Sequence, residues 1–541
     1  MATLNIPKEK FEKEIGKLDE NMQERIIMFG CPIEALNDEE LILEIFPNRP
    51  DLLSYQNFKN SFLSFLGKNK GLNEVDFNKP LKDYEINIDR SVESVRPYTA
   101  CAIVKNLKFD DSKIKEIIDI QEKLHTTVGR NRKKAAIGIY PLEKIKLPIS
   151  YKALLPEKIK FQPLGFSREI NGKQILSQHP AGRDYGHLLE GYDKYPVFMD
   201  AENQILSMPP IINSHNTGKI DEQTKEVFIE CSGYDLDILK KILNIICYTL
   251  SDMGGKIYQM KVNYKKPIIT PDFSKEVMKI SLENTNKLLG LNLKELDLKK
   301  LFEKMGYSYN KGQVFVPSYR TDILHEVDLM EDIAIAYGYD KFIPEIPNIA
   351  GTGEIDKREE LKIKVAEILA GLGMLETSSY HLINLDSIKK FSLNGEEFVK
   401  IKDSKTEFEY LRKNLAIFLL KILGENVDVE YPQDIFQLGR VFNSDLSESE
   451  HLAIASSPGN FTKLKQMLEY LSKMLDIKFE IYKTNIFEPC FIEGRVAEVK
   501  FNGKTLGYFG EVHPKILKNF KIKMPVALLE INLEEIFNLI E

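Results

Sequence analysis

Apolar residues along the chain follow two spacings, and the switches between them mark out four successive blocks, residues 1–83, 84–266, 267–348 and 349–541. Positions that recur every three or four residues predict amphipathic helices, whereas alternation or short apolar runs predict strands. In the first two blocks the pattern predicts helices over residues 52–66, 112–129 and 234–255, and strands over residues 41–46, 100–107, 135–140 and 226–231. This succession of elements indicates a mixed α/β organisation.

Turn-forming residues refine the boundaries within these two blocks. Pro47 and Pro50 interrupt the strand before them, and Asp51 is expected to cap the helix that follows. The lysine-rich segment 68–82 is expected to be a linker. Residues 161–198 form a long polar connection, rich in Gly, Pro and His, and connections of this length are usually functional or flexible.

The third and fourth blocks differ from the first two. The third predicts helices over residues 274–290 and 296–306, a hairpin over residues 307–319, and a final apolar helix, an order that resembles a winged-helix fold. It carries more acidic than basic residues, which argues against entry into a nucleic-acid groove. The fourth block is α/β, and its clearest feature is two alternating strands joined by Asn502-Gly503, a preferred pair for a type I′ hairpin turn.

Composition limits the classes of protein to which the chain can belong. Its 541 residues are enough for several domains, and its 74 Lys and Arg against 81 Asp and Glu make it weakly acidic. A dedicated non-specific nucleic-acid binder would be basic, so any RNA contact must come from local patches. The five cysteines lack CxxC spacing, which argues against a zinc site or a disulfide framework. No membrane-spanning run or signal sequence is present, so the sequence predicts a soluble intracellular protein.

The segment PSYRTDILHEVDLMEDIAIAYGYDKFIP, residues 317–344, places four carboxylates at the start of the final apolar helix of the third block. The pattern predicts that this helix begins near Asp322 and ends at Gly338. Asp328, Glu331 and Asp332 stand at i, i+3 and i+4, so they share one helix face. Such a face can hold a hard divalent cation through oxygen ligands. The alternative is a solvated acidic turn that complements the helix dipole.

Several motifs, taken in order, resemble the β subunit of phenylalanyl-tRNA synthetase of the archaeal and eukaryotic type. PNRPDLLS is similar to the first module of that family. HTTVGRNRKKAAIGIY, YPVFMD, LSMPPIINSHNTGKI and EVFIECSG resemble its editing domain. The acidic segment at 317–344 is close to its most recognisable signature, and IFQLGRVF and LGYFGEVHP resemble its C-terminal domain. The resemblance covers nearly the whole chain.

The resemblance implies an identity for each block. Residues 1–83 would form an N-terminal α+β module, 84–266 a mixed α/β editing domain, and 267–348 a winged-helix-like domain with the acidic metal helix. Residues 349–541 would form a degenerate copy of the class II synthetase catalytic domain, built on an antiparallel sheet. The multidomain fold class expected is therefore α/β and α+β.

The implied editing activity has a physical motive, because an apolar pocket for phenylalanine rejects tyrosine only weakly, by about a hundredfold. A second site would hydrolyse tyrosyl-tRNA(Phe). Glu230 is the candidate partner of the substrate phenol, since a carboxylate is a strong acceptor. The other catalytic candidates are Ser207, Asn213 and Ser232, which could orient the ester and a water. Family members often carry Asp-x-Thr-Gly-Thr where this chain has Glu-Cys-Ser-Gly-Tyr, and Tyr234 could narrow the pocket.

Further sites carry weaker signals. His179, His187 and His215 are either general bases or solvent-facing loop residues, and the second interpretation is preferred. The resemblance favours Mg²⁺ as the ligand of the acidic helix, held by Asp322, Asp328, Glu331 and Asp332. Four cations in five residues either face solvent or contact phosphates of the tRNA acceptor end; these are Arg130, Arg132, Lys133 and Lys134.

The fourth block lacks the arginine motifs with which a class II synthetase binds ATP, so Arg412, Arg440 and Arg495 are interpreted as structural or interface residues. The resemblance implies that the α subunit uses ATP to activate phenylalanine. The chain would act in the cytoplasm, in protein biosynthesis, as the β subunit of a phenylalanine–tRNA ligase, an α₂β₂ heterotetramer that binds tRNA(Phe). Two alternatives are a non-editing scaffold of the same complex and a free-standing RNA-binding or trans-editing protein.

Overall fold

The computed structural model describes residues 2–391, 397–484 and 490–538, and the chain divides into two compact units, Met1–Glu345 and Ile346–Glu541. The predicted multidomain α/β organisation is confirmed, and each unit has cores of its own. Within the described residues, no helix is both long enough and apolar enough to cross a membrane.

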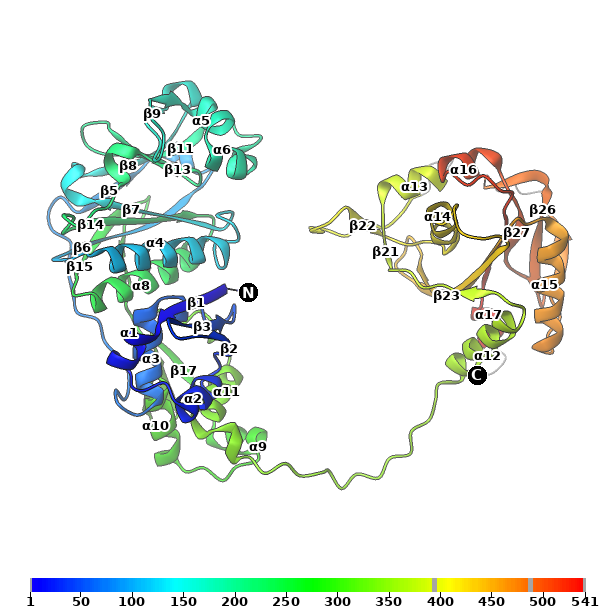
Figure 1. Ribbon diagram of the computed structural model, residues 1–541, viewed down its shortest axis with the longest axis horizontal. Helices are drawn as coiled ribbons and strands as arrows, with labels where there is room; N and C mark the ends of the chain where they lie inside the picture. The colour runs from blue at the N-terminus through cyan, green and yellow to red at the C-terminus, as the bar shows by residue number, and fades with distance from the viewer. Residues whose placement is uncertain (1, 392–396, 485–489, 539–541) are drawn as a thin grey trace. The chain divides into compact units, whose positions relative to one another are not determined.

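The first unit begins with a small antiparallel sheet in the order β1-β3-β2 (Figure 1). Its strands and helices are β1 (Ala2–Pro7), α1 (Lys8–Glu14), α2 (Glu20–Met28), β2 (Ile33–Leu36), β3 (Glu40–Ile45) and α3 (Tyr55–Phe65). The predicted strand and helix are therefore present. The predicted capping by Asp51 is wrong, because Ser54 is the N-cap residue and the buried Asp51 carboxylate pairs with Arg49 at 2.8 Å.

An eleven-stranded sheet forms the centre of the first unit, with the order β13-β12-β11-β8-β5-β15-β6-β14-β7, and with β16 and β4 also paired to β15. Its strands are β4 (Phe77–Asn78), β5 (Glu85–Ile88), β6 (Tyr98–Lys105), β7 (Ala135–Pro141), β8 (Ile149–Leu154), β11 (Tyr195–Met199), β12 (Ile205–Met208), β13 (Ile212–Asn213), β14 (Val227–Gly233), β15 (Lys256–Asn263) and β16 (Ile268–Thr270). The segment predicted to be a linker thus contributes β4 to this sheet.

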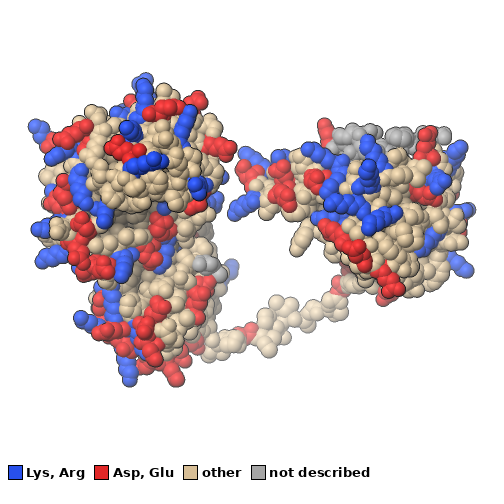
Figure 2. Space-filling model, turned by 45° about the horizontal axis from the view of Figure 1, so that its top comes forward, with Lys and Arg blue, Asp and Glu red and all other residues tan. Residues whose placement is uncertain are grey.

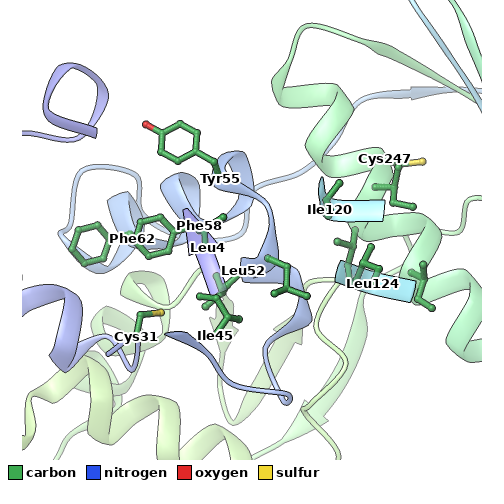
Figure 3. Packing of buried hydrophobic residues seen from close by; sticks show 14 of the residues in the cluster. Leu4, Cys31, Ile45, Leu52, Tyr55, Phe58, Phe62, Ile120, Leu124 and Cys247 are labelled. Carbon is green, nitrogen blue, oxygen red and sulfur yellow. The ribbon is translucent and has the colours of Figure 1, made fainter. Parts of the chain in front are cut away.

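The strands of this sheet separate two cores, because successive side chains point to opposite faces. On one face, Ile137 and Ile229 pack with α4 (Asp111–Thr126), α8 (Leu236–Asp252) and the N-terminal module. Figure 3 shows part of this continuous core, in which Phe58 and Phe62 of α3 stack at 5.5 Å. On the other face, a second core contains Tyr140 and Phe228.

The polar connection over residues 161–198 is ordered and packs on this second face. It contains β9 (Lys160–Phe161), β10 (Ile170–Asn171), α5 (Gly172–Gln178) and α6 (Pro180–Tyr185). Ile170 and Ile175 are buried in the second core, so this connection covers the sheet.

The last part of the first unit is a three-stranded sheet, ordered β17-β19-β18, with three helices. Its elements are β17 (Glu276–Lys279), α9 (Leu282–Leu289), α10 (Glu295–Lys304), β18 (Ser308–Asn310), β19 (Gln313–Val316) and α11 (Glu326–Tyr337). The predicted helix over 274–290 is wrong in its first half, because β17 pairs with β19 and the Ser281 side chain caps α9 by accepting from Asn284 N. The acidic helix α11 begins at Glu326, four residues later than predicted, and ends at Gly338 as predicted.

The second unit contains a seven-stranded sheet, ordered β20-β23-β24-β28-β27-β26-β25, whose only parallel pair among the described residues is β20–β23. Its strands are β20 (Leu375–Glu376), β23 (Gln433–Phe442), β24 (Glu448–Ser457), β25 (Glu480–Lys483), β26 (Phe491–Phe501), β27 (Lys504–Val512) and β28 (Ala527–Asn532). The Asn502-Gly503 hairpin is confirmed, with φ angles of 49° and 78°.

Helices and a separate two-stranded sheet complete the second unit. The helices are α12 (Lys357–Gly371), α13 (Leu385–Phe391), α14 (Ala416–Glu425), α15 (Phe461–Met474), α16 (Pro514–Asn519) and α17 (Glu534–Phe537). In the two-stranded sheet, β21 (Leu382–Asn384) pairs antiparallel with β22 (Phe408–Leu411). Helices α13, α14 and α16 contribute to one core, and α12, α15 and α17 contribute to the other.

Candidate functional site

A cavity of about 100 Å³ in the first unit is lined by Ser207, Asn213 and Glu230, three of the four predicted editing residues. Glu230 is in the middle of β14, which runs between β6 and β7. Ser207 and Asn213 are opposite each other in the β12–β13 pair, whose turn contains Pro209 and Pro210. The fold therefore brings together residues that are up to 23 positions apart in sequence.

Tyr140 lies at the centre of this group, although sequence reasoning did not single it out. Its Oη is 3.1 Å from Glu230 Oε1 and 3.3 Å from Asn213 Oδ1, and its side chain is fully buried. The ring stacks on Phe228 with centroids 5.8 Å apart. In the sequence, Tyr140 ends the apolar run AAIGIY and is not distinguishable from a core residue.

Burial determines the protonation of Glu230. Loss of solvent raises its pKa to about 8, although the Tyr140 hydrogen bond, the Arg96 charge and the Ser232 hydroxyl group partly oppose this rise. At neutral pH the carboxyl group is therefore mainly uncharged. Its Oε2 atom is buried and has no hydrogen-bond partner among the described residues, and the same is true of Ser207 Oγ. Unpaired buried polar atoms are costly, so their presence in one cavity points to a ligand.

Ser232, the fourth predicted editing residue, does not line the cavity. It is buried two positions beyond Glu230 in β14, where its Oγ accepts from Arg96 Nε at 3.3 Å. Arg96 also donates to the carbonyl oxygens of Arg132 and Lys133, at 3.2 and 3.4 Å. Ser232 and Arg96 thus connect β14 to the loop after α4. Tyr234 is 44% exposed, lies over the Arg96 guanidinium and does not line the cavity.

None of the three histidines considered from the sequence lines the cavity. His179 caps α6 by accepting from Ala181 N at 3.1 Å, His187 lies in a 3-10 turn, and His215 begins the short helix α7 (His215–Gly218). The histidine that does line the cavity is His125 of α4, whose Nε2 accepts from Ile137 N at 2.8 Å. This bond and its burial, which lowers the pKa of His125, indicate a structural role.

The four cations of the loop after α4 do not form a single patch. Arg130 and Arg132 have positive φ angles, 47° and 64°. The side chain of Arg132 lines one cavity, and those of Arg130 and Lys134 line another. Arg132 lines the cavity that contains Glu230, donates to Ile211 O at 2.9 Å and pairs with Glu122 at 3.0 Å. Arg130 and Lys134 line a second cavity of about 950 Å³ between the N-terminal module, α8 and the segment before α11. Lys133 is exposed.

Of the four carboxylates predicted to bind a metal, two share one cation, Arg320, and the other two are engaged elsewhere or exposed. Arg320 pairs with Asp322 at 2.7 Å and with Asp332 at 2.9 Å, and Tyr307 also donates to Asp332. Burial opposes ionisation of Asp322, but the bonds and charge of Arg320 outweigh it and lower its pKa.

The other two members of this set do not pair with Arg320. Asp328 caps α11 by accepting from Leu324 N and His325 N, both at 2.8 Å, and Glu331 is exposed. Within the described ranges, no group of three or more His, Cys, Asp or Glu residues is placed to hold a metal ion. In this arrangement the four carboxylates do not fit a magnesium ion.

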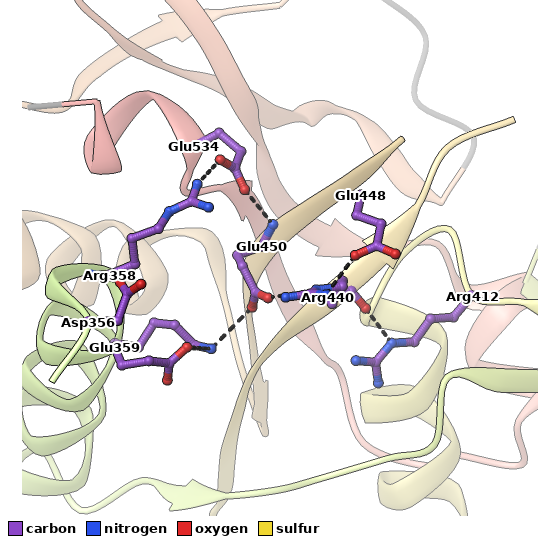
Figure 4. Close-up of polar contacts among 9 residues, drawn as sticks. Asp356, Arg358, Glu359, Arg412, Arg440, Glu448, Glu450 and Glu534 are labelled. Carbon is purple, nitrogen blue, oxygen red and sulfur yellow. Dashed lines mark hydrogen bonds and ion pairs between the residues drawn. The ribbon is translucent and has the colours of Figure 1, made fainter. Parts of the chain in front are cut away.

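The arginines of the second unit are held by protein groups. Figure 4 shows Arg440 between Glu448 and Glu450, at 2.6 and 3.1 Å, with Arg412 donating to its carbonyl oxygen. Arg495 pairs with Glu511 at 2.6 Å. These contacts are those of structural residues.

Figure 2 shows basic and acidic side chains interspersed over the visible face of each unit.

Two family models match the chain. One, described as the phenylalanyl tRNA synthetase beta chain CLM domain, matches residues 343–533, and the tRNA synthetase B5 domain matches residues 278–339. The chain is 35% identical to the phenylalanine–tRNA ligase beta subunit of Archaeoglobus fulgidus over 99% of both chains. It is 37% identical to the protein of the same name from Pyrococcus abyssi, over 99% of this chain and all of the relative.

A solved structure supports the same relationship. It is an N-terminal fragment of the phenylalanyl-tRNA synthetase beta subunit from Pyrococcus horikoshii, with a TM-score of 0.59 and 36% sequence identity. The likeness covers 62% of this chain and the whole of the fragment.

Proposed function

Because the chain belongs to the family of phenylalanine–tRNA ligase beta subunits, we propose that it supports the charging of tRNA(Phe) by an α subunit and removes tyrosine misattached to that tRNA. The α subunit would bind ATP and activate phenylalanine in an α₂β₂ assembly in the cytoplasm. The paired state of Arg412, Arg440 and Arg495 supports this division, since these side chains are engaged within the chain.

The observation that carries the editing proposal is the unpartnered Oε2 of Glu230. A substrate phenol donates one hydrogen bond, and Oε2 is a buried acceptor without a donor in a small cavity. A site built to bond a hydroxyl group rejects the analogue that lacks it much more strongly than an apolar pocket rejects an added hydroxyl. Tyrosine would therefore be held and phenylalanine released intact.

The size of the cavity indicates which part of the substrate enters. Its volume of about 100 Å³ is well below the roughly 300–1,000 Å³ of ordinary ligand pockets. It has room for an amino-acid side chain, so the 3′-adenosine would stay at the opening. Ser207 Oγ and the Asn213 amide, on the cavity wall, would orient the ester and the attacking water.

The basic loop after α4 gives the site a contact for RNA. Arg130, Lys133 and Lys134 have no ion-pair partner among the described residues, and Arg132 Nε, at the cavity, is buried without a hydrogen-bond partner. We propose that these cations contact phosphates of the acceptor end, since phosphate contacts position a nucleic acid without reading its sequence. Magnesium has no part in this proposal, because no three acidic side chains of the described residues are grouped so that they could hold the ion.

The test of the editing function is the release of tyrosine from preformed tyrosyl-tRNA(Phe) by the complex with the α subunit. We expect selective release, with phenylalanyl-tRNA(Phe) as the control substrate. Glu230→Ala should slow tyrosine release about tenfold or more, because one buried hydrogen bond to the phenol is lost.

The same experiment separates the alternatives. A complex that charges phenylalanine but does not release tyrosine would establish the scaffold alternative. Unchanged release by the Glu230→Ala variant would contradict the assignment of the phenol contact. A chain that releases tyrosine but forms no complex with an α subunit would instead be a trans-editing protein.

A further inference from the structure

The position of Tyr140 depends on the glycine two residues before it. Gly138 and Tyr140 share one face of β7, and Gly138 is directly opposite Glu230 in β14. A Cβ atom at Gly138 would lie 2.1 Å from Tyr140 Oη and 2.5 Å from Glu230 Oε1. The missing side chain therefore provides the space in which the hydroxyl and the carboxyl group meet.

The same contact holds the two oxygens of Glu230 in different surroundings. Oε1 bonds to Tyr140, whose ring is fixed by burial and by stacking on Phe228. Oε2 is buried without a partner. A carboxyl group free to rotate would exchange these two positions, whereas a fixed bond to Oε1 keeps the same oxygen available.

We propose that Tyr140 is a positioning residue that orients the Glu230 carboxyl group, so that Oε1 is held within the protein and Oε2 is presented to an incoming phenol. This inference rests on the proposed editing function and extends it to a residue that determines specificity. Tyr140 does not touch the substrate, and it acts only through Glu230.

The arrangement works in both protonation states of Glu230. When the acid is neutral, Oε1–H donates to Tyr140 Oη and the Tyr140 hydroxyl donates to Asn213 Oδ1, which leaves Oε2 as a carbonyl-type acceptor. When the acid is ionised, Tyr140 donates to Oε1, and the phenol donates to Oε2 in a charge-assisted bond, which is stronger. Preference for tyrosine should therefore increase as pH rises through the pKa of Glu230, about 8.

The groups that face Glu230 define the expected pH response. Arg96 is the cation that favours ionisation of Glu230, Tyr140 favours it through its hydrogen bond, and the Ser232 hydroxyl group favours it to a smaller extent. The other titratable groups that interact with Glu230 are Cys101 of β6, Cys231 of β14 and Tyr151 of β8, and burial raises the pKa of each, so they stay neutral near pH 8. Loss of the Tyr140 hydroxyl should therefore raise the pKa of Glu230.

The experiment compares Tyr140→Phe with the parent in the complete complex. The measured quantity is the ratio of single-turnover tyrosine release to phenylalanine release from charged tRNA(Phe), between pH 6.5 and 9.5. The ratio cancels the general effect of hydroxide on ester hydrolysis. We expect a ratio about three- to tenfold lower in the variant, the effect of one lost hydrogen bond. The pH at which the ratio increases should also move upward.

Tyr264→Phe is the matched control. It removes a partly buried tyrosine hydroxyl from the same domain. This hydroxyl accepts from Thr99 N at 2.6 Å and donates to Thr99 O at 2.9 Å, and neither bond involves Glu230. This control should leave both the ratio and its midpoint pH unchanged. A merely structural role of Tyr140 would lower release at every pH without moving the midpoint, and that outcome would overturn the proposal.

A second measurement separates failure of this inference from failure of the proposed function. The carboxyl titration of Glu230 can be followed by infrared difference spectroscopy, with Glu230→Gln as the reference. We expect Tyr140→Phe to raise its midpoint. If the parent shows no preference for tyrosine but Tyr140→Phe raises the titration midpoint of Glu230, the proposed editing function is refuted and the Tyr140–Glu230 contact is supported. If the midpoint does not move, the positioning role is refuted whatever the activity.

Discussion

At the scale of single residues, the buried carboxyl group of Glu230 lowers the stability of the protein as pH rises. Its carboxyl group is buried in a β-sheet core, and loss of solvent raises its pKa from 4.5 to about 8. The folded state therefore holds a proton that the unfolded chain releases above pH 4.5. The stability that this group contributes is fully present below pH 4.5 and is lost as pH rises to 8.

A neutral substitution of Glu230 should remove this dependence on pH. We expect Glu230→Gln to gain stability over the parent progressively between pH 4.5 and 8, by at most about 1.4 kcal/mol per pH unit. Thermal unfolding of both chains at several pH values measures the difference. The control is Glu222→Gln, a substitution at an exposed glutamate, whose stability relative to the parent should not change with pH in this way. A constant difference between Glu230→Gln and the parent would contradict a raised pKa.

Some residues of the candidate site were predicted from the sequence, and others could not be. Glu230, Ser207 and Asn213 were predicted through motifs of a known family, and the structure places all three on one cavity. Tyr140 and Arg96 were missed, because a tyrosine in an apolar strand looks like core and a lone arginine looks like surface. Only the register of β7 against β14 shows that Gly138 and Tyr140 meet Glu230.

At the scale of elements, long periodic segments were predicted well, whereas α3, α9 and α11 begin later than predicted. Helices α4 and α8 and strands β6, β7 and β14 lie within a few residues of their predicted bounds. The acidic helix starts late because the segment contains competing start signals, and the reciprocal bonds of His325 and Asp328 form the cap that is used. Asp322, left outside the helix, pairs with Arg320 instead.

The pairing of Arg320 leads to a prediction about stability. Its side chain is 2% exposed and neutralises Asp322 and Asp332, which are 12% and 7% exposed. Arg320→Met leaves the buried Asp332 and the partly buried Asp322 without the ion-pair partner that they share, so we expect a loss of about 3–5 kcal/mol in unfolding free energy. Denaturant unfolding of the full chain measures it.

A matched control and a rescue variant make this prediction specific. Lys299→Met removes an exposed cation of α10 whose distance to Glu303 is 3.9 Å, and it should cost less than about 1 kcal/mol. Adding Asp322→Asn and Asp332→Asn to Arg320→Met should restore part of the loss, because amides carry no buried charge. No restoration would show that the arginine acts through packing alone.

At the scale of the whole molecule, the sharing of one core by several sequence blocks could not be predicted from the pattern of each block. One core cluster combines the N-terminal module, helices α4 and α8, and the helices of the third block, although their sequences show separate patterns. Tertiary packing between blocks follows from side-chain shape across the fold, which periodicity along the chain does not encode.

The division of the chain at Glu345 has a consequence for folding. Each of the four core clusters lies wholly on one side of this residue in the part of the chain that the structure describes. Between them, residues 343–355 contain no helix or strand, and Ile346 and Ile349 are 96% and 83% exposed. Exposed segments without hydrogen-bonded structure are preferred sites of proteolysis. We therefore expect brief protease treatment to cut within residues 343–355 and to release two fragments that stay folded.

Mass spectrometry of the fragments and calorimetry of the intact chain test this expectation. The N-terminal fragment should unfold in a transition of its own, and it should keep the pH dependence that Glu230 gives the parent, since both faces of the large sheet stay covered within it. The Glu230→Gln variant of the same fragment should lose that dependence. A single transition for the intact chain, or an N-terminal fragment that unfolds on release, would show that the second unit stabilises the first.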